Sequence, residues 1–221
     1  MKKWITSISW EPVHLYAPCR RFLTGWYCKS LGKYTGQLIC TLMGASPHKS
    51  HGSWVNSLAL STDYVLRTGA FDHTRKQFSS PEEIKKVALE SYNTMRGGAP
   101  ERLVSGSDDC TMYLWEPFSN NKSYKARMTG HQETINHVCF SPDGQWVASA
   151  SFDSSVNWSA DSRLLLSCSS DSTLKVWDIR TRKLKEDLPG HSDEVYAIDW
   201  SPDGEKVASG GKDKVLKLWM G

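Results

Sequence analysis

The first candidates for chemistry are a histidine, a serine and an aspartate that recur along the chain at matching intervals. In each set the serine stands four residues before the aspartate; the two sets are His131, Ser149 and Asp153, and His191, Ser209 and Asp213. These residue types can form a hydrolytic triad, in which the histidine takes the proton of a serine nucleophile. On residue types alone, the chain could be a hydrolase.

The recurrence itself argues against catalysis, because a nucleophile is one activated residue in one cleft. A tryptophan also follows the aspartate by six residues in several units; the further members are Trp219, then Ser167, Asp171 and Trp177, and then His51, Ser105, Asp109 and Trp115. We expect the aspartate to accept hydrogen bonds from the histidine and from nearby backbone amides. The serine hydroxyl would meet the histidine and accept from the indole N–H. We predict a structural hydrogen-bond network and no catalytic residue.

Metal and cofactor sites find little support in the sequence. His48 and His51 form an H-x-x-H pair, but no cysteine or acidic pair stands at ligand spacing. The chain has neither of the glycine-rich loops that bind nucleotide phosphates. Asp108 and Asp109 are adjacent, but they follow a predicted strand, where aspartate is typical of turns. We therefore predict no metal and no cofactor.

The elements that would position the network residues are repeated units of short strands. The stretch TGHQETINHVCFSPDGQWVASASFD (129–153) matches PGHSDEVYAIDWSPDGEKVASGGKD (189–213) at a constant offset of sixty. The stretch NWSADSRLLLSCSSDSTLKVWD (157–178) matches DWSPDGEKVASGGKDKVLKLWM (199–220) at an offset of forty-two. Apolar and polar residues alternate within each unit, which is typical of antiparallel strands joined by tight turns. Units of about 40–45 residues with an early Gly-His and a late tryptophan are typical of WD-repeat propeller blades.

The two offsets conflict between Asp153 and Trp158. After Asp171 the next Trp-Ser pair comes twenty-nine residues later, at Trp200, but after Asp153 it comes only five residues later. Twenty-four residues are therefore missing relative to the chain's own period. They would have supplied the strand that ends in tryptophan, the outer strand and the following Gly-His. We predict an all-β WD-repeat β-propeller that is partial or incompletely closed.

The front half of the chain follows the same pattern with an insertion, SSPEEIKKVALESYNTMRGG. Ser80 and Pro81 are typical of a helix start, Glu83 would complete a capping box, and Gly97 would end the helix. The predicted apolar face consists of Ile84, Val87, Ala88 and Tyr92. We predict one helical insertion over about 80–96, within an excursion (73–100) that is a candidate for docking a partner.

The first blade is less regular. WITSISWEP resembles VYAIDWSPD, CRRFLTG can form the second strand, and TGQLICTLMG (35–44) reads as an outer strand. We find no strand with the aspartate and tryptophan landmarks, so we expect a second deletion between Gly25 and Tyr34. The single domain, 1–221, then divides into blade fragments: about 1–44, 45–128 with the insertion 73–100, 129–157 truncated, 158–188 and 189–221.

The net charge of +3 is unevenly distributed, because residues 1–50 carry five lysines and two arginines against one glutamate. A basic front could meet RNA or an acidic partner. A solvated face is the simpler interpretation, since no dense basic run accompanies it. The candidates for partner contact are Lys2, Lys3, Arg20 and Arg21.

Cysteine use and hydropathy indicate the compartment. The six cysteines form no Cys-x-x-Cys pair, and most lie among strand-like apolar residues, which suits a reducing environment. No run approaches the roughly 18 apolar residues of a membrane span. The N-terminal lysines are not followed by the apolar region of a secretory signal. We expect an intracellular, soluble protein without membrane contact.

Several longer stretches resemble the Notchless family of WD-repeat proteins: HGSWVNSLALSTDYVLRTGAFD, ERLVSGSDD, RMTGHQETINHVCFSPD and SADSRLLLSCSSDSTLKVWD. The resemblance implies a β-propeller preceded by a ubiquitin-like domain that engages the midasin ATPase. It also implies a non-catalytic scaffold role in assembly of the large ribosomal subunit, in the nucleolus and nucleus. The implied partners are proteins of pre-ribosomal particles, with rRNA as a further candidate.

The chain departs from the family pattern in ways that affect these expectations. It lacks the ubiquitin-like domain, so no residue here is assigned to a midasin contact. Together with the two deletions, this indicates a shortened form. Two alternatives remain open: a WD-repeat adaptor that modulates Notch signalling, and a truncated isoform without independent function. The hydrolase interpretation is disfavoured because its residues recur with the repeat.

Overall fold

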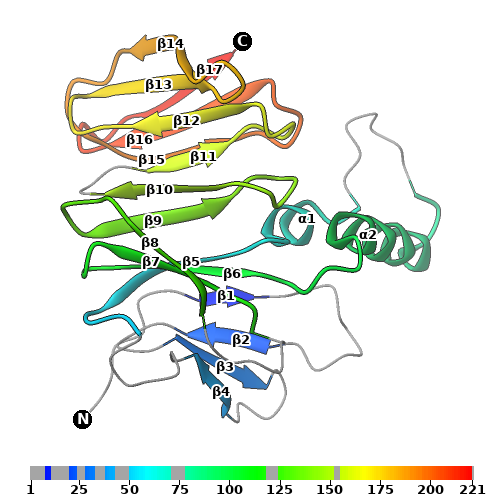
Figure 1. Ribbon diagram of the computed structural model, residues 1–221. Coiled ribbons are helices and arrows are strands. Elements are labelled where there is room, and N and C mark those ends of the chain that lie inside the picture. The colour runs from blue at the N-terminus through cyan, green and yellow to red at the C-terminus, as the bar shows by residue number, and fades with distance from the viewer. Residues whose placement is uncertain are drawn as a thin grey trace.

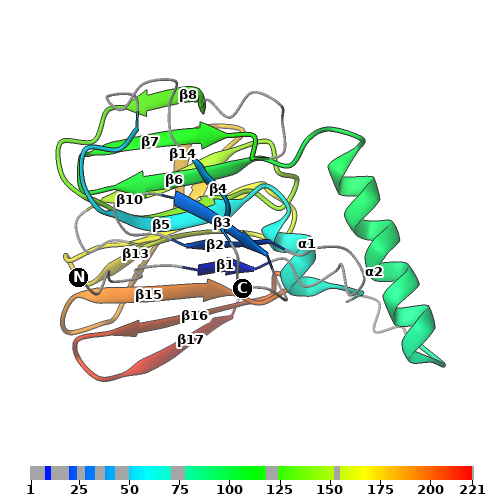
Figure 2. The ribbon, with the colours of Figure 1, turned by 90° about the horizontal axis from the view of Figure 1, so that it is seen from below.

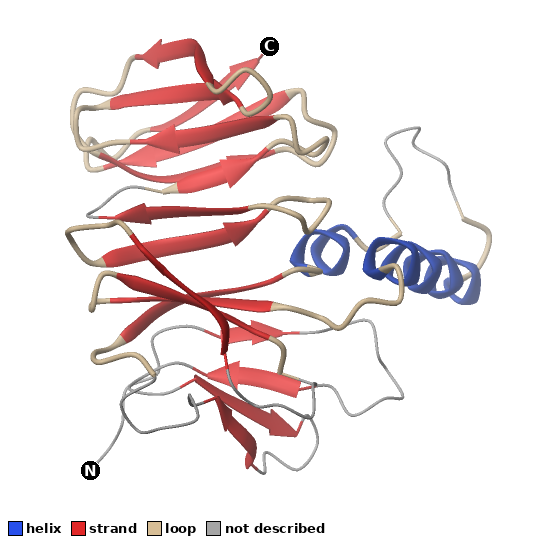
Figure 3. Ribbon diagram, in the orientation of Figure 1, coloured by secondary structure: helices blue, strands red, loops and turns tan. Residues whose placement is uncertain are grey.

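Strands make up most of the part of the chain that the computed structural model describes, namely residues 8–10, 20–23, 28–32, 38–42, 50–70, 78–117, 124–151 and 155–220. In this part the strands form five antiparallel sheets, stacked one above another, with two helices on one side (Figures 1 and 3). The N-terminal sheet lies at one end of the stack and the C-terminal sheet at the other (Figure 1). The predicted all-β propeller fold with an open ring and a helical insertion is confirmed.

The first two sheets each contain four strands in chain order. The first consists of β1 (Ile8–Trp10), β2 (Arg20–Leu23), β3 (Cys28–Gly32) and β4 (Leu38–Leu42). The second consists of β5 (Val55–Leu60), β6 (Leu103–Ser107), β7 (Thr111–Trp115) and β8 (Tyr124–Thr129).

The other three sheets differ in strand number. The third contains only β9 (Ile135–Phe140) and β10 (Val147–Ser151). The fourth contains β11 (Val156–Trp158), β12 (Leu164–Cys168), β13 (Thr173–Asp178) and β14 (Lys183–Pro189). The fifth contains β15 (Val195–Trp200), β16 (Lys206–Gly211) and β17 (Leu216–Met220). The chain thus passes from one sheet to the next within the few residues between Ser151 and Val156.

The sequence interpretation is wrong for the first sheet. We expected a deletion between Gly25 and Tyr34, but β3 lies there, pairs with both β2 and β4 and completes a sheet of four strands. The prediction was based on the absence of the aspartate and tryptophan residues that mark the third strand in the other units. A strand needs only an extended backbone between two partners, so the absence of those landmarks did not exclude one.

The helical insertion is α2 (Pro81–Arg96), within the predicted limits. Ser80 Oγ accepts the Glu83 N–H at 3.2 Å, and the Glu83 carboxylate accepts the N–H and the hydroxyl of Ser79. Gly97 ends the helix with a φ of 57°, a left-handed conformation that glycine adopts without strain. Residues 73–77 of the predicted excursion lie outside the described residues.

The predicted apolar face of α2 is only partly right. Tyr92 is 2% exposed and packs in a cluster with Val65, with Tyr64 and Met95 at its edge, but Ile84 is 43% exposed. The first half of α2 extends away from the stacked sheets, which explains the exposure of Ile84 (Figure 2). A second helix, α1 (Asp63–Thr68), follows β5 and was not predicted.

Adjacent sheets are held together by apolar clusters from facing strands. Between the second and third sheets, Val104 packs against Ile135 and Val138. A Cβ on Gly106 would lie 2.7 Å from a methyl carbon of Ile135, so this close approach of the sheets requires glycine. Among the described residues, no helix combines the length and apolar character that a membrane span requires.

Candidate functional site

The second sheet contains a complete set of the four network residues. His51 precedes β5, Ser105 lies on β6, Asp109 lies in the β6–β7 turn and Trp115 ends β7. His51 Nε2 is 2.7 Å from Ser105 Oγ, and His51 Nδ1 is 3.2 Å from Asp109 Oδ2. Trp115 Nε1–H donates to the same Ser105 Oγ at 2.9 Å. The four side chains therefore link a loop, a turn and two strands of one sheet.

One set of hydrogen positions satisfies every polar atom of this group. The Ser105 hydroxyl donates to His51 Nε2, and His51 Nδ1–H donates to the Asp109 carboxylate. Asp109 also accepts the Gly52 N–H at 2.7 Å and the Thr111 hydroxyl at 2.6 Å. Burial raises the pKa of Asp109, but the hydrogen bonds from His51, Thr111 and Gly52 outweigh it and hold the pKa well below its usual range. The carboxylate is thus fixed in its charged form.

The fifth sheet contains a second complete set. His191 Nδ1 is 2.8 Å from Asp213 Oδ2, and His191 Nε2 is 2.8 Å from Ser209 Oγ. Trp219 Nε1–H donates to Ser209 Oγ at 2.8 Å, and Ser192 N–H donates to Asp213. Burial raises the pKa of Asp213. The hydrogen bonds from His191 and from backbone amides lower it by more than burial raises it, so the net shift of the pKa is downward.

The third and fourth sheets each bring together only part of the set. In the third, His131 Nε2 is 2.8 Å from Ser149 Oγ, while Asp153 lies outside the described residues. In the fourth, Trp177 Nε1–H donates to Ser167 Oγ at 2.9 Å. Asp171 accepts the N–H and hydroxyl of Thr173, and its pKa is lowered mainly by that hydroxyl.

The geometry of the complete sets resembles a catalytic triad but lacks access to a substrate. Ser105 is fully buried and Ser209 is 1% exposed, so neither hydroxyl can reach a bound molecule. Each serine oxygen also accepts an indole N–H, which lowers its availability as a nucleophile. Buried polar groups with all partners present stabilise a fold by fixing one arrangement. The sets can do this in every sheet where they are complete.

The structure describes some of the remaining sequence candidates and not others. Lys2, Lys3 and His48 lie outside the described residues, and Arg20 and Arg21 belong to β2. Among the described residues no group of histidine, cysteine and acidic side chains could hold a metal ion. Asp108 accepts a hydrogen bond from Asn56, whereas its neighbour Asp109 belongs to the network.

Sequence reasoning missed a second repeated contact, between serine and aspartate in the turns that join the first two strands of a sheet. Ser159 Oγ donates to Asp161 Oδ1 at 2.6 Å, and its oxygen accepts the Leu164 N–H at 2.9 Å. The equivalent pairs are Ser141 with Asp143 and Ser201 with Asp203. The Ser-x-Asp spacing repeats in the sequence and could have revealed them. These contacts fix the conformation of each turn. The contact of Ser141 with Asp143 fixes the β9–β10 turn, where Trp146 is exposed.

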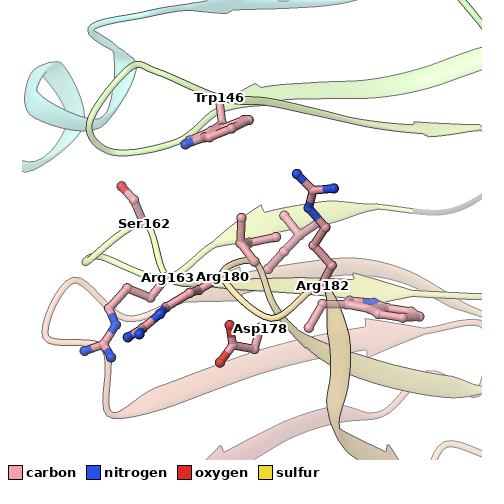
Figure 4. Close-up of a pocket in the computed structure, with 9 residues that line it drawn as sticks. Trp146, Ser162, Arg163, Asp178, Arg180 and Arg182 are labelled. Atoms are coloured by element: carbon pink, nitrogen blue, oxygen red, sulfur yellow. The ribbon is translucent and has the colours of Figure 1, made fainter.

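A cavity of about 620 Å³ lies beside the incomplete third sheet. Its lining includes Trp146 from the β9–β10 turn and Leu165 and Trp177 from the fourth sheet. Three arginines complete one side, Arg163, Arg180 and Arg182. Figure 4 shows Trp146 on one side of the opening and the arginines on the other. No motif in the sequence indicates this cavity, apart from the short interval between Asp153 and Trp158.

Comparison with known proteins agrees with the repeat pattern. Residues 82–116, 122–157, 154–178 and 182–220 match the WD40 family model, described as WD domain, G-beta repeat.

Individual relatives match over parts of their length. The chain is 57% identical over 111 residues to Ribosome assembly protein 4 of Saccharomyces cerevisiae, covering 49% of this chain and 21% of that protein. It is 64% identical over 86 residues to the Notchless protein homolog of Arabidopsis thaliana, covering 39% and 18%. It is 39% identical over 185 residues to Protein Notchless of Drosophila melanogaster, covering 64% and 38%. The predicted resemblance to Notchless proteins is confirmed, and the matches span well under half the length of these relatives.

Proposed function

Because the chain belongs to the WD40 family of G-beta repeat proteins, we propose that it is a non-catalytic scaffold in assembly of the large ribosomal subunit. It acts by contacts with proteins of pre-ribosomal particles, in the nucleolus and nucleus. The observation that carries this proposal is the 57% identity to a yeast protein named Ribosome assembly protein 4. The matched stretch covers 49% of this chain, which is why the role named for that relative is carried over to it.

The network geometry supports the non-catalytic part of the proposal. The histidine and serine of each complete set are buried, the sets occur in more than one sheet, and each serine oxygen also accepts an indole N–H from a tryptophan. We propose that residues 1–221 act as one partial propeller domain with the blade fragments given above, adjusted so that the fourth fragment begins at β11. The basic residues of the first fifty are the candidates for rRNA contact.

Sedimentation of tagged chain with ribosomal precursors tests the proposal. The full chain is expressed in cells, and nuclear extract is separated on a sucrose gradient. We expect the chain in the fractions that hold large-subunit precursors, and we expect a parallel ribonuclease treatment to move it to lighter fractions as the particles break up. A chain that gives a cooperative unfolding transition and yet stays at the top of the gradient would contradict the proposal.

A further inference from the structure

The cavity is lined by the β9–β10 turn of the two-stranded third sheet on one side and by the fourth sheet and its turns on the other. Among the described strands, the sheets on either side contain four each, whereas the third contains β9 and β10. The face of the fourth sheet that carries Leu165 and Trp177 is therefore covered only in part, and Trp146 is 56% exposed. An exposed tryptophan beside an apolar cavity is a feature of binding surfaces.

The outer edge of β10 presents backbone groups that can pair with another strand. The Ser141 N–H donates to the Trp146 carbonyl, and the Val138 N–H donates sideways to Ser57 Oγ. Together with the register, these bonds make Phe140–Val147 and Val138–Ser149 pairs of the non-hydrogen-bonded kind. The backbone N–H and C=O groups of Val147 and Ser149 consequently point away from β9. Among the described strands none pairs with this edge.

The charge at one end of the cavity is positive. Arg163, Arg180 and Arg182 line it, with Asp178 as the acidic residue of the lining. The Asp178 carboxylate accepts the Thr181 N–H, so its negative charge is partly compensated by the backbone of the β13–β14 turn. Arg182 extends toward the side of the opening where Trp146 lies (Figure 4). Guanidinium groups of this kind suit carboxylates, which they can bind through two hydrogen bonds.

We propose that this cavity and the β10 edge bind an extended acidic segment of a partner protein, which adds a strand to the third sheet. All neighbouring strands are antiparallel, so the segment runs antiparallel to β10 and places its C-terminal end beside Trp146 and the arginines. Apolar side chains of the segment cover Leu165 and Trp177, and acidic side chains near its C-terminal end meet the arginines. Strand addition gives affinity through the backbone, and the cavity gives specificity.

Two other occupants fit less well. In a second copy, the edge strand β17 is flanked by Lys212 and Lys214 and contains Lys217, so pairing through β17 would bring like charge to the arginines. A single-stranded nucleic acid could stack on Trp146, but its backbone lacks the regularly spaced N–H and C=O groups that pair with the edge of a strand. The inference stands independently of the proposed role in ribosome assembly.

A synthetic peptide tests the inference on the full chain. Its N-terminal half alternates valine and threonine, its C-terminal half is glutamate and aspartate, and binding is followed by fluorescence anisotropy. N-methylation of alternate residues in the first half removes the backbone donors, and we expect it to weaken binding about tenfold. A peptide with lysine in place of the acidic residues should not bind.

A matched pair of variants locates the peptide. Arg182 has a φ of 57° and Lys214 a φ of 62°, so Arg182→Gly and Lys214→Gly each remove one positive charge from a turn that glycine adopts without strain. We expect Arg182→Gly to weaken binding about threefold to fivefold and Lys214→Gly to leave it unchanged. Equal effects of the two variants, or unchanged binding after N-methylation, would overturn the inference. So would oligouridine that binds in an Arg182-dependent way while the peptide does not, or a dimer that Arg182→Gly dissociates.

Discussion

At the scale of single residues, Ser105 and Ser209 show how one hydroxyl can satisfy two buried partners. Each oxygen accepts an indole N–H, and each hydroxyl contacts a histidine nitrogen whose ring is fixed by an aspartate. A hydrolase would present the same residue types with the serine open to a substrate. Burial of the serine therefore distinguishes the structural arrangement from the catalytic one.

Asp109 makes the stability of the second sheet dependent on pH. Its pKa is lowered in the folded state, so its contribution is complete above the pKa of the unfolded carboxyl and is lost as the pH falls toward the folded value. We expect Asp109→Asn to lower the free energy of unfolding by about 1–3 kcal/mol at pH 7. The difference from wild type should narrow between about pH 5 and pH 3. Urea unfolding across this range measures it.

The control for this prediction is Asp187→Asn, which removes an exposed carboxylate from an ion pair with Lys175. Exposed pairs contribute less than about 1 kcal/mol. If the two substitutions lowered stability equally, or if the Asp109 effect did not change with pH, the account of this carboxylate would be wrong.

Trp115 and Trp158 provide a matched comparison of a paired and an unpaired buried indole. Trp115 is 1% exposed and donates to Ser105, whereas Trp158 is 6% exposed and its N–H has no partner among the described residues. Substitution by phenylalanine removes the same volume at both positions. We expect Trp115→Phe to lower the free energy of unfolding by about 1–3 kcal/mol more than Trp158→Phe. Thermal unfolding would contradict this if Trp158→Phe were the more damaging change.

At the scale of secondary structure, α2 is attached to the sheets by its second half. Tyr92 is buried in the cluster that also contains Leu60, Leu103 and Trp115, while Ile84 in the first half is exposed. The helix is thus fixed by a few side chains at one end. Its first two turns are held by capping contacts of Ser79, Ser80 and Glu83.

Substitutions in α2 should reflect this one-sided attachment. We expect Tyr92→Ala to lower the free energy of unfolding by about 3 kcal/mol, because it leaves a cavity in the core. Ile84→Ala should change it by less than about 0.5 kcal/mol, because the side chain is exposed. Urea unfolding compares the two. Similar losses for both variants would mean that the whole helix packs on the sheets.

The elements differ in how far the sequence could predict them. The limits of α2 were predictable, because Ser80, Pro81 and Gly97 act locally. The exposure of Ile84 was not predictable, because an apolar face in the sequence does not show how much of that face packs against a partner. Helix α1 was missed because it replaces the turn that other sheets use at this point, and its start is fixed by a contact of Asp63 with the Leu60 N–H.

The candidate site was predictable where its residues recur at the spacing of the repeat. The spacing of His51, Ser105, Asp109 and Trp115 indicated which side chains meet, and the structure places them within hydrogen-bonding distance. The cavity beside β10 was not predictable in the same way. The cavity is formed by residues from two different sheets, so the sequence of a single repeat does not reveal it.

At the scale of the whole molecule, the sheets form an open stack whose last member has an uncovered side. Leu216, Leu218 and Met220 of β17 are between 67% and 79% exposed, and β17 pairs with β16 along one edge. Cohesion depends on the contacts between neighbouring sheets, because the first and last sheets lie at opposite ends (Figure 1). Those contacts hold the stack together, whereas the shape of each single sheet depends largely on hydrogen bonds within that sheet.

This view predicts a graded cost for removing the network serine from each sheet. Ser105 and Ser209 each contact a histidine and a tryptophan, whereas Ser149 contacts His131 and Ser167 contacts Trp177. The alanine substitution at a complete network leaves two buried polar groups without a partner. At an incomplete one it leaves a single group.

Urea unfolding of these four serine-to-alanine variants therefore tests the structural role of the network most directly. We expect Ser105→Ala and Ser209→Ala each to lower the free energy of unfolding by about 1–3 kcal/mol, and Ser149→Ala and Ser167→Ala to lower it by clearly less. Equal losses at all four positions, or the largest loss at Ser149 or Ser167, would contradict the account.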